Sequence, residues 1–167
     1  RRTVLPSSEL FYHAVTFSHD GAYLYYVATG KNLPVRTLYR ASVLGGPTER
    51  LLAPVNRAVS FSPDGSQIAF SMNAGGNLDV YVIAAAGGEA KRLTYHPKED
   101  AVVGWTPDGK SILLRSRRVT DATHQLYTIS AQGGFEKQLP FPLAWEGSFS
   151  ADALRIAYTP LTDPTRT

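Results

Sequence analysis

The densest group of side chains that could do chemistry lies at residues 95–100, with the sequence Tyr-His-Pro-Lys-Glu-Asp. His96, Glu99 and Asp100 belong to the residue types that bind metal ions or exchange protons. The same residues also fit a solvated loop shaped by Pro97, which needs no particular geometry of the side chains. This is the interpretation that we favour. We therefore assign no metal site and no acid–base pair to this stretch.

A second group consists of Arg115, Arg117 and Arg118, which lie just before a stretch that differs between the repeats described below. Guanidinium groups so close together could contact an anion or an acidic peptide. Because charged side chains mostly remain in water, we expect an exposed charged edge at this place instead.

The sequence contains none of the short motifs that accompany common enzyme sites. It has no Gly-x-Ser-x-Gly, no His-Glu-x-x-His and no glycine-rich phosphate loop. It has no cysteine, which excludes disulfides, thiolate metal sites and cysteine nucleophiles. The histidines fit structural positions, with His19 in a turn, His124 before a strand, and His13 and His96 in loops between repeats. We predict a chain that is not an enzyme and that needs no cofactor.

The composition is that of a folded domain without a marked preference for nucleic acid or lipid. Hydrophobic residues make up 43% of the 167 residues, which is enough apolar material for a core. The net charge of +3 is small and scattered, so we expect no nucleic-acid partner. Apolar runs are only a few residues long and no basic-then-apolar segment begins the sequence, so we predict neither a membrane span nor a signal peptide.

The elements that must position these side chains follow from an internal repeat. Phe17, Phe61, Trp105 and Phe149 each begin a turn sequence related to Ser-Pro-Asp-Gly, and successive copies are 44 residues apart. An aliphatic residue follows each aromatic residue after seven positions. Between the turns, Leu-Tyr or Val-Tyr recurs three times, and a Gly-Gly pair follows each Tyr by six residues. Repeats of 40–45 residues are typical of β-propeller blades.

Each repeat predicts four short antiparallel strands. Residues before each turn alternate between small or polar and large apolar side chains, which is the pattern of a strand. Pro presets φ and Gly adopts positive φ, so the turn sequence favours a tight hairpin. His19 replaces Pro in the first turn, and Ala151 and Ala153 replace Pro and Gly in the fourth. We expect the fourth hairpin to be weaker for this reason.

The predicted fold class is therefore all-β, a single propeller domain over residues 1–167 made of four-stranded antiparallel blades. The repeats are approximately residues 12–54, 55–97, 98–142 and 143–167, with residues 1–6 as a closing outer strand. We expect large side chains to pack between neighbouring blades and small ones to line a narrow central channel. The first set is Val15, Phe17, Val59, Phe61, Val103, Trp105 and Phe149, and the second is Thr16, Ser60, Gly104 and Ser148.

The succession of Ser-Pro-Asp-Gly, Ile-Ala-Phe, Val-Tyr, Gly-Gly and Lys-Arg-Leu-Thr resembles the WD40-like PD40 repeat of TolB and related bacterial proteins. Residues 91–161 are more similar to the propeller of tricorn-type proteases, through segments 92–97, 105–109 and 154–161. Those proteases carry their catalytic Ser and His in later domains. The resemblance therefore implies no catalytic residue at any position of this sequence.

Residues 16–70 resemble the PD40 repeats attached to bacterial Ser/Thr kinases and regulators, through segments 38–40 and 43–46. The two halves could come from different parents, as in a recombined or engineered chain. TolB-type relatives imply a periplasmic location and tricorn-type relatives a cytoplasmic one, so the compartment stays undecided.

Strand counting leaves the last blade incomplete. One outer strand, three full repeats and two further strands make fifteen, whereas four blades need sixteen. PD40 blades generally form rings of six or more, and an open half-ring would expose a wide apolar face at each end. The chain is then part of a longer propeller or half of a homodimeric eight-bladed ring, and we favour the dimer.

The loops that join blades, and those between second and third strands, share one face of a propeller. We expect this face to hold a peptide or protein partner, since variable loops on a rigid scaffold commonly carry binding sites. It would present Tyr12, His13, Arg57, His96, Glu99, Arg117, Phe141 and Trp145, together with Phe11, Lys31, Arg36, Asp121 and Glu146. The function that we favour is a non-catalytic interaction or scaffold module that closes into a ring. The alternative is a substrate-docking or gating propeller from a tricorn-like peptidase.

Overall fold

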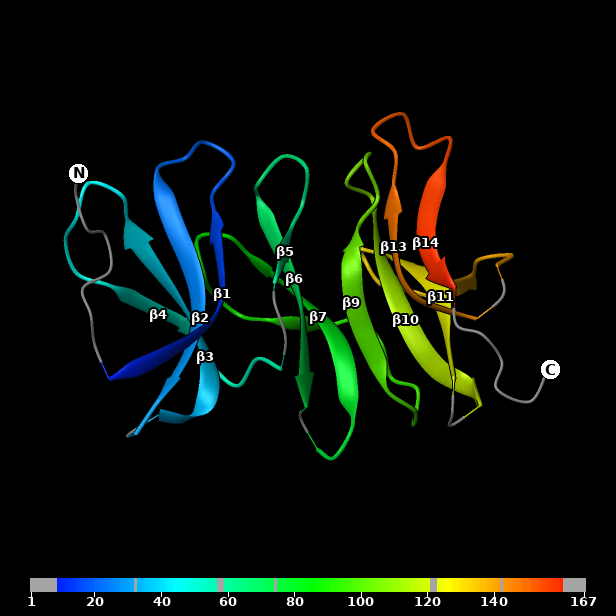
Figure 1. Ribbon diagram of the computed structural model, residues 1–167, viewed down its shortest axis with the longest axis horizontal. Helices are drawn as coiled ribbons and strands as arrows, with labels where there is room; N and C mark the ends of the chain where they lie inside the picture. Colours follow the sequence, from blue (N-terminus) through cyan, green and yellow to red (C-terminus); the bar gives the residue numbers. More distant parts are fainter. Residues whose placement is uncertain are drawn as a thin grey trace.

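The chain folds into short antiparallel strands in this computed structural model, which describes residues 9–31, 33–56, 59–73, 75–120, 123–141 and 143–160. Within these ranges there is no helix, and consequently none that is long and apolar enough to cross a membrane. The strands form four separate sheets, which we call blades 1 to 4 and which follow one another along the chain (Figure 1).

The first three blades each have four strands in sequence order. Blade 1 contains β1 (Leu10–Phe17), β2 (Tyr23–Gly30), β3 (Leu33–Ser42) and β4 (Glu49–Leu52). Blade 2 contains β5 (Ser60–Phe61), β6 (Gln67–Asn73), β7 (Leu78–Ala84) and β8 (Lys91–Arg92). Blade 3 contains β9 (Asp100–Trp105), β10 (Ser111–Thr120), β11 (Thr123–Ser130) and β12 (Lys137–Gln138). Blade 4 is described as β13 (Ala144–Phe149) and β14 (Ile156–Pro160).

The predicted all-β propeller architecture is confirmed by these sheets. The predicted closing strand at residues 1–6 and the last part of the fourth repeat, residues 161–167, lie outside the described residues. His13 was expected in a loop, but β1 begins at Leu10 and includes it, with a bulge in the pairing between Tyr12 and Ala14. His124 was expected before a strand and lies within β11, where it is buried.

The turn between the first and second strand of each blade has one recurring hydrogen-bond pattern. In blade 2, the Ser62 hydroxyl donates to Asp64 Oδ1 at 2.6 Å, and the Gly65 N–H donates to the Ser62 carbonyl at 2.8 Å. Gly65 has a φ of 72°, a conformation that glycine adopts without steric cost. The fourth turn keeps the pattern with Ala153 at a φ of 59°, so this hairpin forms with a side chain in a strained backbone region.

The core lies between successive blades rather than within any one of them. Tyr25, Val27 and Leu38 of blade 1 pack against Ile68 and other apolar residues of blade 2. Blade 2 packs against blade 3, and blade 3 against blade 4, through equivalent positions. Each four-stranded sheet can therefore bury a face only by stacking on a neighbour.

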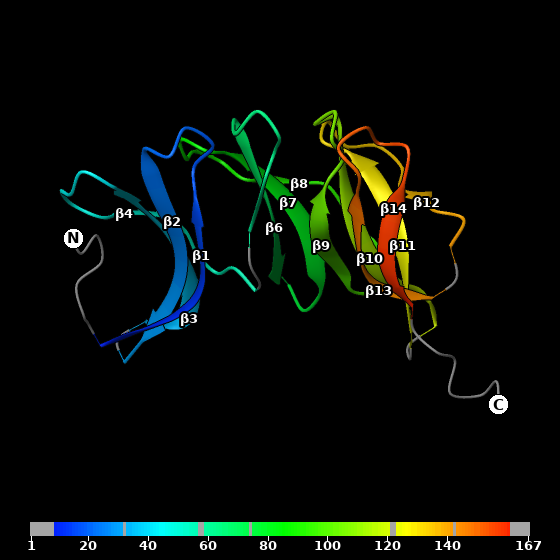
Figure 2. The same cartoon turned by 45° about the horizontal axis from the view of Figure 1, so that its top comes forward.

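Figure 2 shows the same row of blades, with blade 1 and blade 4 at opposite ends. Phe61, Trp105 and Phe149 are partly buried between blades, as predicted. Val15 and Phe17 in β1 are 56% and 61% exposed, so within the single chain they do not pack between blades as predicted. The reason is their position, since among the described residues no blade stands against that side of β1.

Candidate functional site

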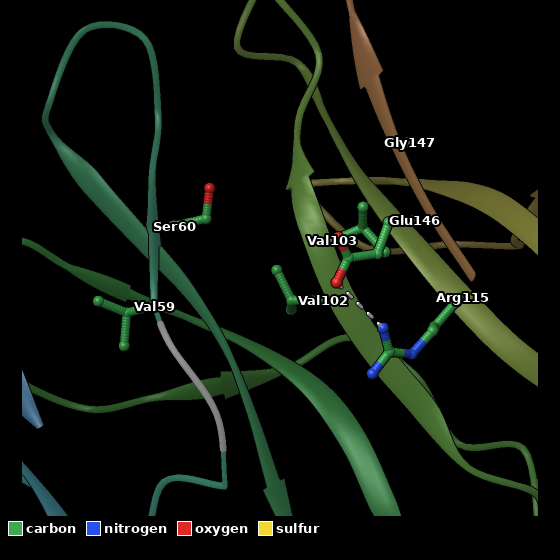
Figure 3. Close-up of a pocket in the computed structure, with 7 residues that line it drawn as sticks. All are labelled: Val59, Ser60, Val102, Val103, Arg115, Glu146 and Gly147. Atoms are coloured by element: carbon green, nitrogen blue, oxygen red, sulfur yellow. Dashed lines mark ion pairs between the residues drawn. The ribbon is translucent and has the colours of Figure 1, made fainter. Parts of the chain in front are cut away.

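The strongest candidate site is a hollow on the inner side of the row, where the first strands of three blades meet. Strand β9 contacts both β5 and β13, so these inner strands lie side by side. A cavity of ≈ 430 Å³ lies between them (Figure 3). Its lining residues are Val59, Ser60, Val102, Val103, Arg115, Glu146 and Gly147.

Arg115 supplies the charged group of this hollow. It belongs to β10, and its guanidinium lies 4.1 Å from the centre of the Trp145 ring, within the range of a cation–π interaction. Its Nη1 donates to the Trp145 carbonyl at 3.3 Å and forms an ion pair with Glu146 Oε1 at 3.9 Å. The side chain is buried, so the expectation of an exposed charged edge is wrong for Arg115. Figure 3 shows its guanidinium directed toward the hollow and toward Glu146.

A similar correction applies to Arg118 in β10 of blade 3, whose side chain is only 13% exposed. Arg118 Nη2 lies 2.7 Å from Oδ2 of the fully buried Asp100, and Nη1 lies 3.1 Å from Glu136. Asp100 is thus part of a strand and an ion pair, whereas we expected it in a solvated loop. In blade 2, Asp79 pairs with Arg92 at 2.6 Å. Burial raises the pKa of Asp79, and the charge of Arg92 opposes this effect.

In the part of the chain that the structure describes, no three His, Cys, Asp or Glu side chains lie close enough together to share an ion. The His96 ring accepts a hydrogen bond from the Lys98 N–H at 3.1 Å, and its carbonyl accepts one from Asn77 Nδ2 at 2.6 Å. Glu99 instead approaches Arg117, with 3.8 Å between Oε2 and Nε. These contacts hold the segment between blades 2 and 3.

The predicted partner-binding residues fall into separate groups. Tyr12 and His13 lie on blade 1, where the His13 ring is 2.8 Å from the Thr29 hydroxyl. Glu99 and Arg117 meet on blade 3. Phe141 packs against Tyr158 of blade 4 with ring centres 5.1 Å apart, Trp145 packs against His124 at 4.7 Å, and Arg57 lies outside the described residues. The partner-binding role of these residues stays a prediction.

The hollow itself was missed by sequence reasoning, although the repeat contained a signal for it. Arg115 follows Val27 and Ser71 in the 44-residue register, and both of these residues are buried between blades. Register alone therefore places a guanidinium at an inter-blade position. A charge there needs partners from the next blade, and Trp145 and Glu146 provide them.

Four-stranded antiparallel sheets stack face to face, and the first strands of blades 2, 3 and 4 lie side by side along the inner side of the row. This arrangement defines the protein as a β-propeller. Its sequence places it more narrowly, since residues 35–167 match the family described as the tricorn protease N-terminal beta propeller domain. The chain belongs to this family. The propeller domain of tricorn and TolB-like proteins is non-catalytic, and their peptidase relatives carry the catalytic parts in other domains.

The chain is similar to several known proteins, among them the following three. It is 30% identical over 144 residues to Uncharacterized protein Atu1656 of Agrobacterium fabrum, which covers 83% of the chain and 46% of that protein. It is 37% identical over 81 residues to Tricorn protease homolog 1 of Streptomyces coelicolor, covering 46% of the chain and 8% of that protein. The crystal structure of TolB from Acinetobacter baumannii has a TM-score of 0.72 at 26% identity, covering 99% of the chain and 41% of the TolB chain. The chain therefore spans less than half of each relative.

Proposed function

We propose that this chain is a non-catalytic propeller module that closes into an eight-bladed ring with a second copy and presents its loop face to a peptide or protein. The observation that carries this proposal is the pair of blade faces, one at each end of the row, that no other blade covers among the described residues. Val15 and Phe17 are exposed on blade 1, and Ala157 and Thr159 are exposed on blade 4.

Positions equivalent to these end residues are covered in the interior of the row. Ala69 and Leu113 correspond to Ala157, and both are almost fully buried against the next blade. Phe61 corresponds to Phe17, and its ring lies 4.7 Å from that of Tyr25 in the preceding blade. The exposed face of blade 4 thus corresponds to the faces of blades 2 and 3 that contact the next blade. The exposed face of blade 1 corresponds to the face of blade 2 that contacts the preceding blade. Repeating this contact between two copies gives a symmetric ring without any new kind of interface.

The stacking of the turns supports the same arrangement. Gly65 in the turn of blade 2 lies against His19 of blade 1, and Gly109 of blade 3 lies against Pro63 of blade 2. Gly21 is the equivalent glycine of blade 1, and a Cβ added there would meet no atom within 4 Å. Ala151 corresponds to His19 and Pro63 in the repeat. In the proposed ring, Ala151 of the second copy would therefore lie against Gly21.

The test is the solution mass, measured by light scattering coupled to size exclusion. The ring predicts a sharp peak at twice the chain mass of 18.2 kDa. Phe17→Asp introduces a charge into the interface and should give a monomer. Phe135→Asp is the matched control, because Phe135 is almost fully exposed on a turn away from both ends and its replacement should leave the dimer intact. A monomeric wild-type chain contradicts the ring.

The loop face has its own test. Trp145→Ala and Arg117→Ala should each weaken binding of a peptide that the wild-type chain retains. Unchanged affinity in both variants contradicts the assignment of this face.

A second candidate function is a substrate-docking or gating propeller of a tricorn-like peptidase. The family membership and the similarity to Tricorn protease homolog 1 favour it. Further blades of the same polypeptide would then cover the ends of the row. A longer natural chain should in that case be monomeric, and Phe17→Asp should lower its thermal stability without changing its mass. A different origin for the two halves of the chain stays a hypothesis.

A further inference from the structure

A guanidinium group occupies an inter-blade position, whereas every other blade has a short side chain at the corresponding place in the repeat. Arg115 corresponds to Val27, Ser71 and Thr159 of the other three blades. A buried charge is unfavourable unless other groups compensate for the lost water. The Trp145 ring and carbonyl supply part of this compensation, and they fix the guanidinium at the edge of the hollow.

The acidic partner of Arg115 within the hollow is loosely held. Glu146 Oε1 lies 3.9 Å from Nη1, whereas charge-assisted hydrogen bonds between these groups are about 2.7–2.9 Å long. The Glu146 side chain is 65% exposed, and that of Arg115 only 3%. At 3.9 Å the pair includes no hydrogen bond, and the Glu146 carboxylate is already mostly in water, so Glu146 can move aside while Trp145 continues to hold Arg115.

The remaining walls of the hollow indicate what could replace Glu146. Val59, Val102 and Val103 contribute apolar surface, and Ser60 contributes a hydroxyl group. A free space of ≈ 430 Å³ is large enough for a small organic acid or an acidic side chain. Glu146 itself is a carboxylate on a short aliphatic chain, and it already approaches the guanidinium from inside the hollow (Figure 3).

We infer that this hollow is a binding site for a carboxylate carried on a short aliphatic chain, with Arg115 as the binding residue and Glu146 as a displaceable internal competitor. Arg115 pairs with the incoming carboxylate, and the three valines cover its aliphatic part. The site lies within one chain, between blades 2, 3 and 4. It therefore does not depend on ring closure.

Trp145 provides a direct signal for the test, since it packs on Arg115. Trp105→Phe leaves it as the single tryptophan, and Phe61 and Phe149 at the equivalent positions indicate that phenylalanine fits there. Hexanoate is titrated at constant ionic strength, and hexylamine serves as the oppositely charged probe. N-acetyl-glutamate amide tests whether an acidic side chain of a polypeptide binds as well as a free acid.

Hexanoate or N-acetyl-glutamate amide should change the Trp145 emission saturably, and hexylamine should not. Glu146→Gln should tighten binding about two- to fivefold, because it removes the competing charge. Arg115→Gln should abolish the saturable change. The inference is overturned if neither acid binds to Glu146→Gln, if hexylamine acts equally well, or if a folded Arg115→Gln still binds. Should Arg115→Gln fail to fold, the exposed Glu146→Gln alone decides the result.

Discussion

The turns between the first and second strands of the blades hold equivalent glycines with the same backbone conformation but different neighbours. The free energy of unfolding should therefore respond differently to the same substitution at each glycine. Gly21, Gly65 and Gly109 have φ values of 69°, 72° and 68°. A Cβ added at Gly21 would meet nothing within 4 Å. At Gly109 it would lie 3.4 Å from Cδ of Pro63, an ordinary contact, but at Gly65 it would lie 2.8 Å from Cβ of His19.

Replacement by alanine should therefore separate the backbone cost from the packing cost. A non-glycine residue in the left-handed region costs about 1–2 kcal/mol, partly offset by the reduced freedom of the unfolded chain, so Gly109→Ala should cost about 1 kcal/mol. Gly21→Ala should cost the same in the monomeric Phe17→Asp variant, where no second copy covers this turn. Gly65→Ala should cost about 1–3 kcal/mol more, because the His19 Cβ is fixed by the backbone and cannot rotate away.

Urea denaturation at one protein concentration measures these differences as shifts of the midpoint at constant slope. A double-variant comparison identifies the atom responsible. His19→Gly should restore most of the stability lost in Gly65→Ala, whereas His19→Ala should not, because it keeps the clashing Cβ. Equal losses at Gly109 and Gly65, or equal rescue by both substitutions of His19, would refute the reasoning.

Three further predictions concern other single positions. Ala153→Gly should raise the free energy of unfolding by about 0.5–1 kcal/mol, because it removes a side chain at a φ of 59°, and an unchanged urea midpoint would mean that the turn holds no such strain. Arg118→Ala should cost about 3–5 kcal/mol in the same assay, since it leaves the buried Asp100 carboxylate without its ion pair, and a loss below about 1 kcal/mol would contradict this account. Hydrogen bonds from the Ser62 hydroxyl and from the backbone N–H and hydroxyl of Ser66 lower the pKa of Asp64 to about 2. Because this folded-state pKa lies below the ordinary value of 3.8, its contribution is present above about pH 4 and is lost as the pH falls toward 2. Thermal unfolding across this range should show a smaller pH dependence in Asp64→Asn, and an identical dependence would refute the assignment.

The sequence carried enough information for the propeller because its signals are local. The Ser-x-Asp-Gly turn is defined by hydrogen bonds within five residues, and the 44-residue spacing repeats it in register. Even Ala153, which departs from the pattern, keeps the turn, because Ser150 and Asp152 supply the same hydrogen bonds. Turn chemistry and strand alternation therefore predicted the first three blades correctly.

The polar contacts between strands could not be predicted in the same way. Arg118 and Asp100 are 18 residues apart and meet only because β10 pairs with β9 across a register shift. Arg115 was assigned to the surface because it stands in a basic run. Its side chain nevertheless lies between blades, since strand alternation directs it away from solvent. A residue's charge indicates what partners it needs, but the register of neighbouring strands decides whether it finds them.

The proposed ring and the proposed carboxylate site are physically separable, which makes each a control for the other. Phe17 lies on blade 1, at the far end of the row from the hollow, so Phe17→Asp should change the mass and leave hexanoate binding unaltered. Glu146→Gln removes an exposed carboxylate on the inner side of blade 4, so it should alter hexanoate binding and leave the mass unaltered. If Phe17→Asp abolished both properties, the hollow would require the closed ring for its shape. Binding in the monomeric variant would instead show that three neighbouring blades are sufficient to form the site.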